Sequence, residues 1–409
     1  MITCLLFIAG CGKETPTPVP GSTSQSTSSS TTQAPVPASP AQKQESAAES
    51  TAALAKRKAT ALKALSDVML DKAKFYSTDN KRELYLRDYK DSDTGPGGNS
   101  KVRYNASGFD VVDMNGDGVP EVILDMSSAP NSDFDPGYEL LHYRSGKVEG
   151  FFFGFREIAT LAKNGLFSAG NATNNYIEKM RFLGDTYDIS PQYYIESADG
   201  SDSSKSIYFY YYDVPLTERS YNAAYKDTPY EQARGYSFSD SSIKKWVTNR
   251  PASADPKPAA LNADLVARQN YLDRLAANGS LKSPGGEAFG GLDEAAQDDQ
   301  VYAYYQSWDK ELNKIYGLLE KKLPADQMNT LRADEHQWIT VRDKNATLAE
   351  KQWKGRMPGT SDAAEIDQAK NSRLADVTKN RTFYLIDRYF GDTSQPTTTE
   401  IIQKYGLKQ

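Results

Sequence analysis

The sequence predicts an α+β protein: a mixed middle domain with antiparallel strands and an N-terminal helix, followed by a C-terminal three-helix bundle. Between residues 100 and 250, short apolar runs alternate with Gly- and Asn-containing turns, which is typical of antiparallel strands. Around residues 52–68 and after residue 296, apolar residues recur every three or four positions, which indicates amphipathic helices. The chain has 409 residues, enough for two domains behind an N-terminal leader.

The N-terminal 50 residues differ from the rest in composition. An apolar start ends in Ile8-Ala9-Gly10-Cys11, and a Ser/Thr/Pro/Gln tract follows. The four residues resemble the lipobox of bacterial lipoproteins, in which the cysteine carries a diacylglyceryl anchor. The resemblance implies a signal peptide at 1–11, lipidation of Cys11 and an extracellular, membrane-anchored location on a Gram-positive bacterium. Residues 12–50 lack apolar periodicity and are predicted to be a disordered tether. A soluble protein with an apolar start is the alternative.

Composition excludes several classes of site and partner. Both cysteines, Cys4 and Cys11, lie in the leader, so the body has no disulfide, thiolate metal site or cysteine nucleophile. The two histidines, His142 and His336, are far apart in sequence and neither lies in a nucleophile motif. A net charge of −6 disfavours nucleic acid as a partner. No segment after residue 14 has the length and apolar character of a membrane span, so a lipid anchor is the only membrane contact predicted.

The elements of the middle domain, residues 52–250, follow from local patterns. A helix begins at Ala52, with Leu54, Ala61, Leu65 and Val68 on one face. Ser145-Gly146 predicts a hairpin between its flanking strands. The expected strands are Phe109–Asp113, Val119–Asp125, Tyr138–Arg144, Gly150–Phe155 and Ile207–Asp213.

The C-terminal part has helical periodicity. Residues 251–295 contain a Pro/Ala stretch, a short helical run and a Gly-rich segment, and are predicted to be a linker. Residues 296–391 contain three apolar stripes at helical spacing, which predict a small antiparallel bundle. Pro324 suits the start of the second helix, and a Gly/Pro-rich loop is expected at 354–361. The tail, 392–409, is predicted to add a short docked helix.

The strongest chemical motif is the acidic loop, residues 113–121. Oxygen ligands fall at alternate positions: Asp113, Asn115, Asp117, the Val119 carbonyl and Glu121. Calcium takes six to eight oxygen ligands, and alternating oxygens on a tight loop converge on one point. The motif is not an EF-hand, because position 12 is Leu124 and a strand follows. Calcium is therefore a predicted cofactor, and a loop held by Asx-turns without an ion is the alternative.

The acidic loop also resembles the DxNxDG loops of FG-GAP and VCBS-type extracellular repeats, in which such a loop joins or precedes a strand. The surrounding residues, roughly 58–250, are similar to a module found in lipoproteins of Gram-positive bacteria. The stretch YELLHYRSGKVEGFFFGFR contributes to this likeness. The resemblance implies no particular activity.

Residues 306–390 resemble the lysozyme inhibitor LprI family. The matching residues lie on all three predicted helices in the family's order: Leu312, Asn313 and Tyr316, then Trp338, Arg342 and Asp343, then Arg381. The resemblance implies an exported helical bundle that inhibits lysozyme-type muramidases. Family members usually carry a cysteine pair that forms a disulfide. Here Asn345-Ala346-Thr347 follows the Arg-Asp pair, so the bundle must hold by packing alone.

Each of these residues also has a structural interpretation. Trp338 lies on the apolar stripe, which favours a core position, and Arg342 and Asn313 suit ion pairing and backbone bonding. Partner contacts are expected on exposed groups instead. Lys354 and Arg356, in the predicted loop, could pair with the two catalytic carboxylates of a lysozyme cleft. A solvated loop without a partner is the alternative.

Three functions remain open from the sequence. The leading hypothesis is a non-enzymatic, surface-anchored lipoprotein whose bundle binds and inhibits a muramidase. The second is an envelope or adhesion protein that binds wall polymer or another protein without inhibiting it. The third is a hydrolase, which is disfavoured because no nucleophile–base pair or catalytic metal set is visible.

Overall fold

The computed structural model describes residues 51–90, 103–128, 137–154, 156–170, 175–197, 207–228, 230–251, 254, 264–284, 289–356, 363–391 and 395–408. Within these residues the chain is α+β, with two sheets followed by long helices, as the sequence predicts. The lipobox, Cys11 and the predicted tether lie outside the described residues, so their assignment stays a prediction. None of the described helices is both long and apolar enough to cross a membrane.

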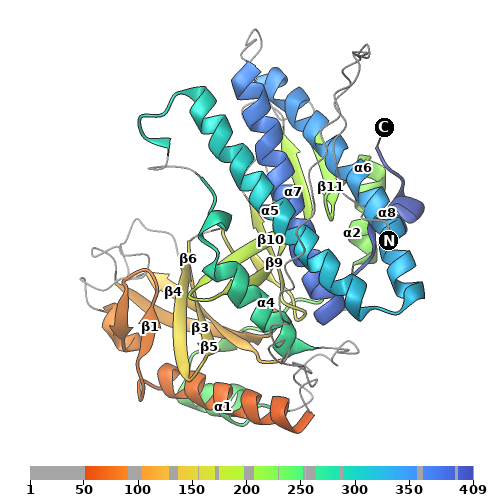
Figure 1. Ribbon diagram of the computed structural model, residues 1–409. Helices are drawn as coiled ribbons and strands as arrows, with labels where there is room; N and C mark the ends of the chain where they lie inside the picture. Colours follow the sequence, from red (N-terminus) through yellow and green to blue (C-terminus); the bar gives the residue numbers. More distant parts are fainter. Residues whose placement is uncertain are drawn as a thin grey trace, which may run out of the picture. The chain divides into compact units, whose positions relative to one another are not determined.

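The first described sheet, whose strands β3 to β6 are labelled in Figure 1, has seven strands in the order β13-β3-β4-β5-β6-β1-β2. Among the described strands of this sheet, only β1 and β6 pair in parallel. The predicted hairpin is present: Ser145 and Gly146 connect β5 to β6 and have φ values of 51° and 88°, the left-handed backbone that a two-residue hairpin turn requires. The strands are β1 (Phe75–Ser77), β2 (Arg82–Leu84), β3 (Tyr104–Val112), β4 (Glu121–Ser128), β5 (Gly137–Arg144), β6 (Lys147–Phe153) and β13 (Tyr236–Ser237).

The second sheet is an antiparallel meander in the order β12-β11-β10-β9-β8-β7. Of its strands, the sequence predicts only the one that starts at Ile207. A register shift between Pro191 and Tyr193 interrupts the pairing of β10 with β9. The strands are β7 (Thr160–Leu161), β8 (Leu166–Gly170), β9 (Asn175–Leu183), β10 (Thr186–Ser197), β11 (Ile207–Tyr211) and β12 (Val214–Leu216).

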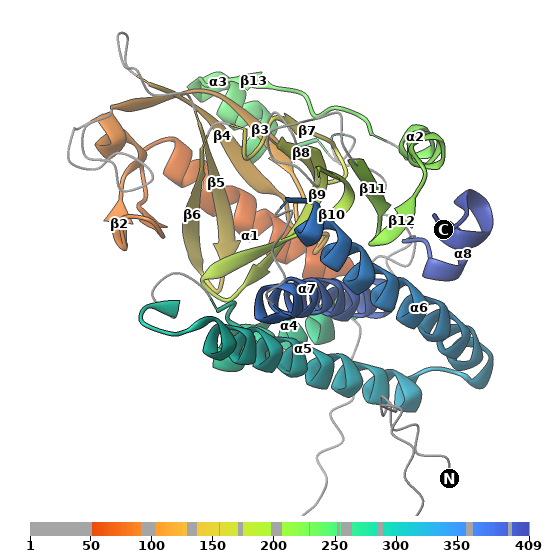
Figure 2. The same ribbon diagram turned by 90° about the horizontal axis from the view of Figure 1, so that it is seen from above.

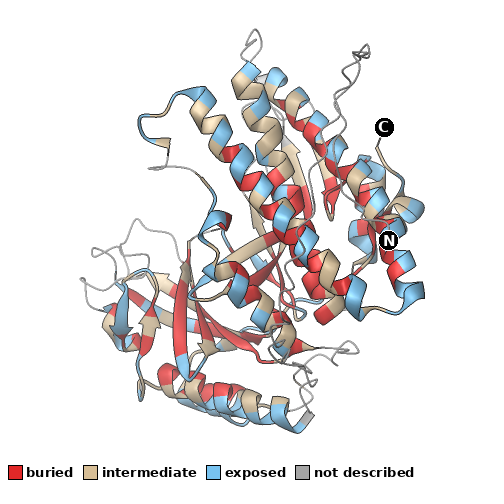
Figure 3. Ribbon diagram, viewed as in Figure 1, coloured by how far each residue is buried: buried red, intermediate tan, exposed pale blue. Residues whose placement is uncertain are grey.

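The two sheets share a core, and helix α1 (Thr51–Met69) covers the far face of the first sheet (Figure 3). Side chains alternate along a strand, so Val122 and Ile123 of β4 face opposite ways. Val122 belongs to the buried cluster that contains Leu65 of α1, and Ile123 belongs to the one that contains Phe182 of β9. Short helical segments complete the first sheet's outer layer: η1 (Leu86–Lys90), α3 (Asp240–Ile243) and the π-helix η3 (Lys244–Thr248).

Three long helices form the C-terminal bundle, with α7 (Ala363–Phe390) lying between α5 (Glu294–Lys322) and α6 (Ala325–Arg356) (Figure 2). Asp293 caps α5 by accepting a hydrogen bond from the Ala296 N–H. The bundle core holds large apolar side chains from all three helices: Trp308, Leu312, Ile315, Leu319, Leu331, Trp338, Phe383 and Leu385.

The described residues from 51 to 408 belong to one compact unit. The segment predicted as a linker contains α4 (Leu265–Ala277) and the 3-10 helix η5 (Gly279–Leu281). Helix α4 packs against both β9 and α7, because Leu272 and Leu275 enter the bundle core. Helices α2 (Glu218–Asp227) and α8 (Thr398–Tyr405) cover part of the second sheet, and a capping box between Thr397 and Glu400 starts α8.

Candidate functional site

The acidic loop connects β3 to β4, and its side chains fold back onto its own backbone. The Asp113 carboxylate accepts hydrogen bonds from the N–H groups of residues 116–118 at 2.8, 3.1 and 2.9 Å. Asn115 Oδ1 accepts from the Asp117 N–H, and Asp117 Oδ1 accepts from the Val119 N–H. The alternating oxygens therefore make a series of Asx-turns.

Positive charge reaches the loop from three other elements. Arg57 of α1 donates to Asp117 Oδ2 at 3.0 Å and to the Asp117 carbonyl at 2.8 Å. Arg268 of α4 donates to the Asn115 carbonyl at 2.8 Å. Burial and the neighbouring Asp117 raise the pKa of Asp113 to about 6, against the opposing charge of Lys179 on β9. The loop is thus neutralised in part by the chain's own cations.

These contacts bear on the predicted calcium site. Glu121 Oε2 accepts from the Met114 N–H at 2.8 Å, and Glu121 Oε1 lies 2.9 Å from His142 Nδ1. Across the part of the chain that the structure describes, no three His, Cys, Asp or Glu side chains are grouped as a metal site. As arranged, the loop side chains do not form an open oxygen cage: calcium would have to displace Arg57 from Asp117 and draw Glu121 away from its partners. Calcium stays a prediction.

The Glu121–His142 pair is part of the core. His142 stacks on Phe182 with ring centroids 3.7 Å apart. Burial raises the pKa of Glu121 well above its usual range and lowers the pKa of His142 to about 4. Both shifts favour the uncharged forms. His142 is therefore a satisfied core histidine, closed to a substrate.

A buried charge cluster joins the sheet, α4 and α7. The Asp387 carboxylate of α7 lies between two arginines. Nε and Nη2 of Arg181 on β9 are 2.8 and 2.6 Å from its Oδ2, and Nε and Nη2 of Arg268 on α4 are 2.9 and 2.6 Å from its Oδ1. All three side chains are almost fully buried. Since Arg268 also binds the Asn115 carbonyl, the cluster connects the acidic loop directly to the helices. We call Arg181, Arg268 and Asp387 the buried triad.

Four of the predicted family residues lie inside the protein: Leu312, Trp338, Arg342 and Arg381. Arg381 of α7 binds Asp334 and Glu335 of α6 at 2.6 Å each and donates to Thr398 Oγ1 at 3.3 Å. This network ties α7 to α6 and to the start of α8. These residues therefore hold the bundle together, and they are not on a surface that a partner could reach.

The other three predicted family residues are more exposed. Asn313 donates to the Asp309 carbonyl one turn earlier at 2.8 Å, so it bonds within its own helix. Tyr316 is half-buried beside the bundle core. Asp343 is exposed and accepts from Arg342 at 2.8 and 2.9 Å. These contacts again fit the structural interpretation.

The predicted partner residues do not lie in a loop. Helix α6 continues to Arg356, so both Lys354 and Arg356 are in its last turn, and the prediction of a loop from residue 354 is wrong at this point. Lys354 is exposed and pairs with Glu350 at 2.6 Å, an i,i+4 contact that supports the helix. The Arg356 side chain lies outside the described parts.

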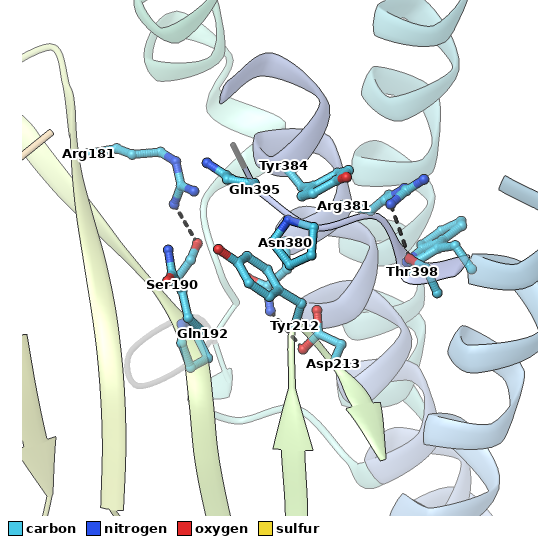
Figure 4. A pocket seen from close by; sticks show the side chains of 13 residues that line it. Arg181, Ser190, Gln192, Tyr212, Asp213, Asn380, Arg381, Tyr384, Gln395 and Thr398 are labelled. Carbon is cyan, nitrogen blue, oxygen red and sulfur yellow. Dashed lines mark hydrogen bonds between the residues drawn. The ribbon is translucent and has the colours of Figure 1, made fainter. Parts of the chain in front are cut away.

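A cavity of about 30 Å³ lies where the helices meet the second sheet (Figure 4). Its walls include the Tyr212–Asp213 turn, Trp338 and Arg381. Tyr384 Oη and Gln395 Nε2 are buried there without a hydrogen-bond partner. A cavity of this size holds a water molecule or two and excludes a sugar or an organic cofactor.

Sequence reasoning did not single out Asp213 or the buried triad. One local signal for Asp387 exists: it interrupts the apolar run FYLIDRYF on the inner face of a helix, where a charged residue needs a partner. The partners themselves come from 119 and 206 residues away, and no pattern in the sequence pairs them.

Comparison with known proteins gives a family match in the C-terminal helices. No curated protein and no solved structure matches the chain. Residues 293–385 match the model of the family described as lysozyme inhibitor LprI, which runs from the N-cap of α5 to Leu385 in α7.

Proposed function

We propose that the chain is a non-enzymatic, surface-anchored lipoprotein whose C-terminal helices bind and inhibit a lysozyme-type muramidase. The match of α5, α6 and most of α7 to the lysozyme inhibitor family carries the proposal. Lipid anchoring rests on the lipobox at Cys11. The non-enzymatic part of the proposal is supported by the family description, which is that of an inhibitor.

The contact surface is the C-terminal third of α6. Because the buried family residues cannot touch a partner, an inhibitory contact has to use the outer face of the bundle. There Lys351 and Lys354 are exposed, and Arg356 ends the helix. Lys344 and Lys408 add two further ammonium groups near Lys351. Burial lowers the pKa of Lys344, and repulsion from Lys351 and Lys408 lowers it further.

This group of lysines, Lys344, Lys351, Lys354 and Lys408, suits an acidic target. A lysozyme cleft contains two catalytic carboxylates. Cations on a rigid helix can approach such a cleft without ordering a loop, which lowers the entropic cost of binding. The charges are few and lie at the surface, so we expect micromolar affinity at best.

The test measures how far the full chain, expressed without its lipid anchor, inhibits the hydrolysis of cell walls by lysozyme. The variant Lys351→Glu with Lys354→Glu should weaken inhibition on the order of tenfold, or about 1.4 kcal/mol. The matched control is Lys310→Glu with Lys321→Glu, which makes the same charge change at exposed positions of α5. Equal loss in both variants would mean that only net charge matters, and no inhibition by folded wild type at high micromolar concentration would refute the proposal.

A second candidate is an envelope protein that binds wall polymer or another protein and inhibits nothing. The observation that favours it is the burial of Leu312, Trp338, Arg342 and Arg381. Because these residues carry the family resemblance, the resemblance then indicates a shared fold and not a shared contact surface. Pull-down by purified cell walls, without inhibition of lysozyme, distinguishes this candidate from the first.

A further inference from the structure

The turn between β11 and β12 has an unusual backbone. Tyr211 pairs with Val214, so Tyr212 and Asp213 alone form the turn, with φ values of 46° and 62°. Two consecutive left-handed residues make a tight hairpin turn, and Asp tolerates this region better than Tyr does. Tyr212 is held there by ring contacts with Tyr211 and with Tyr384 of α7. The turn is therefore fixed by what packs on it.

Asp213 joins three elements at one residue. Its carboxylate accepts hydrogen bonds from Tyr194 Oη of β10 at 2.9 Å and from Asn380 Nδ2 of α7 at 3.2 Å. Its carbonyl accepts from Asn345 Nδ2 of α6 at 2.8 Å. Asn345 is completely buried, and Asp213 nearly so. Helices α6 and α7 are thus both bonded to one turn of the second sheet.

The cations around Asp213 are bound to other acids. Arg373 of α7 pairs with Glu196 of β10. Arg381, in the same cavity wall, pairs with Asp334 and Glu335.

The remaining charged neighbours do not neutralise the carboxylate either. Arg181 of β9 also lines the cavity, and it is committed to Asp387. Asp376 of α7 adds a like charge, while Asn345 and Trp338 of α6 are neutral. Among the described residues no ion pair reaches Asp213, and burial raises its pKa to about 7. The adjacent cavity gives water a place to enter when the carboxyl group ionises.

We propose that the β11–β12 turn is a pH-sensitive latch: it holds α6 and α7 on the second sheet while the Asp213 carboxyl group is protonated, and it loosens them when that group ionises. The closed latch binds a proton more tightly than the open one, in which Asp213 faces water. Opening therefore becomes easier as pH rises from about 4 to about 7, by up to about tenfold per pH unit, and levels off above that range.

The test measures amide hydrogen exchange of the full chain, without its lipid anchor, by mass spectrometry from pH 5 to pH 8. The result is expressed as protection factors relative to the intrinsic exchange rates at each pH. Protection of β11–β12 should fall as pH rises, relative to that of α1, whose only acid, Asp67, is partly exposed. In Asp213→Asn, which keeps the shape and the Tyr194 bond but cannot ionise, this fall should shrink or vanish. Equal pH profiles for folded wild type and Asp213→Asn would overturn the proposal.

A matched control uses Glu178 of β9, a half-buried acid whose pKa is also raised to about 7 by burial. Glu178→Gln should keep the pH-dependent loss of protection at β11–β12, and its disappearance would assign the effect to Glu178 and refute the latch. If Asp213→Asn does not fold, Asn380→Ala serves instead. It retains the titrating group and removes a donor to the ionised form, so the loss of protection with pH should become larger. An unchanged profile in that variant would contradict the proposal.

Discussion

Removing the charge of Asp387 should destabilise the protein more than any surface substitution. Its carboxylate makes four contacts of 2.6 to 2.9 Å with Arg181 and Arg268, and its side chain is 1% exposed. In Asp387→Asn two buried guanidinium groups lose their counter-ion. Breaking a buried pair by removing one partner costs about 3–5 kcal/mol, because a buried charge is left uncompensated.

The assay is urea unfolding of the full soluble chain at pH 7. The matched control is Asp367→Asn on the same helix, where a half-exposed acid pairs with Lys370 and the expected cost is below about 0.5 kcal/mol. A loss under about 1 kcal/mol for Asp387→Asn, similar to that of the control, would refute the view that this acid fixes the helices to the sheet.

The same acid sets a pH dependence. Burial alone raises the pKa of Asp387, but the charges of Arg181 and Arg268 outweigh it and hold the pKa well below its usual range. A depressed pKa stabilises the folded state above the unfolded pKa, near 4, and this stability is lost as pH falls further. Unfolding free energies between pH 5 and pH 2 should therefore converge for wild type and Asp387→Asn.

Three further predictions follow from other residues. Trp338→Ala should cost about 3–5 kcal/mol in urea unfolding, since the side chain is buried in the bundle, whereas Tyr302→Ala at an exposed position should cost under about 1 kcal/mol; similar costs would move Trp338 to the surface. If calcium binds the acidic loop, millimolar calcium should raise the melting temperature, Arg57→Ala should enlarge the shift by freeing Asp117, and Asp113→Ala should abolish it; no shift in wild type or Arg57→Ala means no ion there. Mass spectrometry of the native membrane fraction should find a diacylglyceryl group on Cys11, and unchanged membrane retention of Cys11→Ala would contradict lipidation.

The bundle could be predicted because its signal is local. Apolar residues from Val301 to Leu319 recur every three or four positions, and α5 contains all of them. The helix begins about two turns earlier, at Glu294. The hairpin at Ser145-Gly146 is equally local. Helix α6 passes the expected loop start because a single glycine, Gly355, costs only about 1 kcal/mol in helix propensity and does not by itself end the helix.

The second sheet and the buried charges could not be predicted in this way. Strands β9 and β10 mix tyrosines with charged residues such as Lys179, Arg181 and Asp188, so neither face reads as apolar. Two of these groups are paired by α7: Asp387 binds Arg181, and Lys379 pairs with Asp188. The partners are distant in sequence, and only the tertiary fold shows that they meet. The motif residues Asp113 to Glu121 could be placed in a loop, but the cations that reach them come from α1, β9 and α4.

The buried triad also constrains the order in which the chain can fold. Its contacts, with the bond from Arg268 to Asn115, join residues 119 to 206 positions apart. Contacts of such separation close late, because long stretches of chain must be ordered first. Both arginines lack their shared counter-ion until residue 387 has been synthesised, because the carboxylate that neutralises them belongs to α7. The last quarter of the sequence therefore completes the interior of the first half.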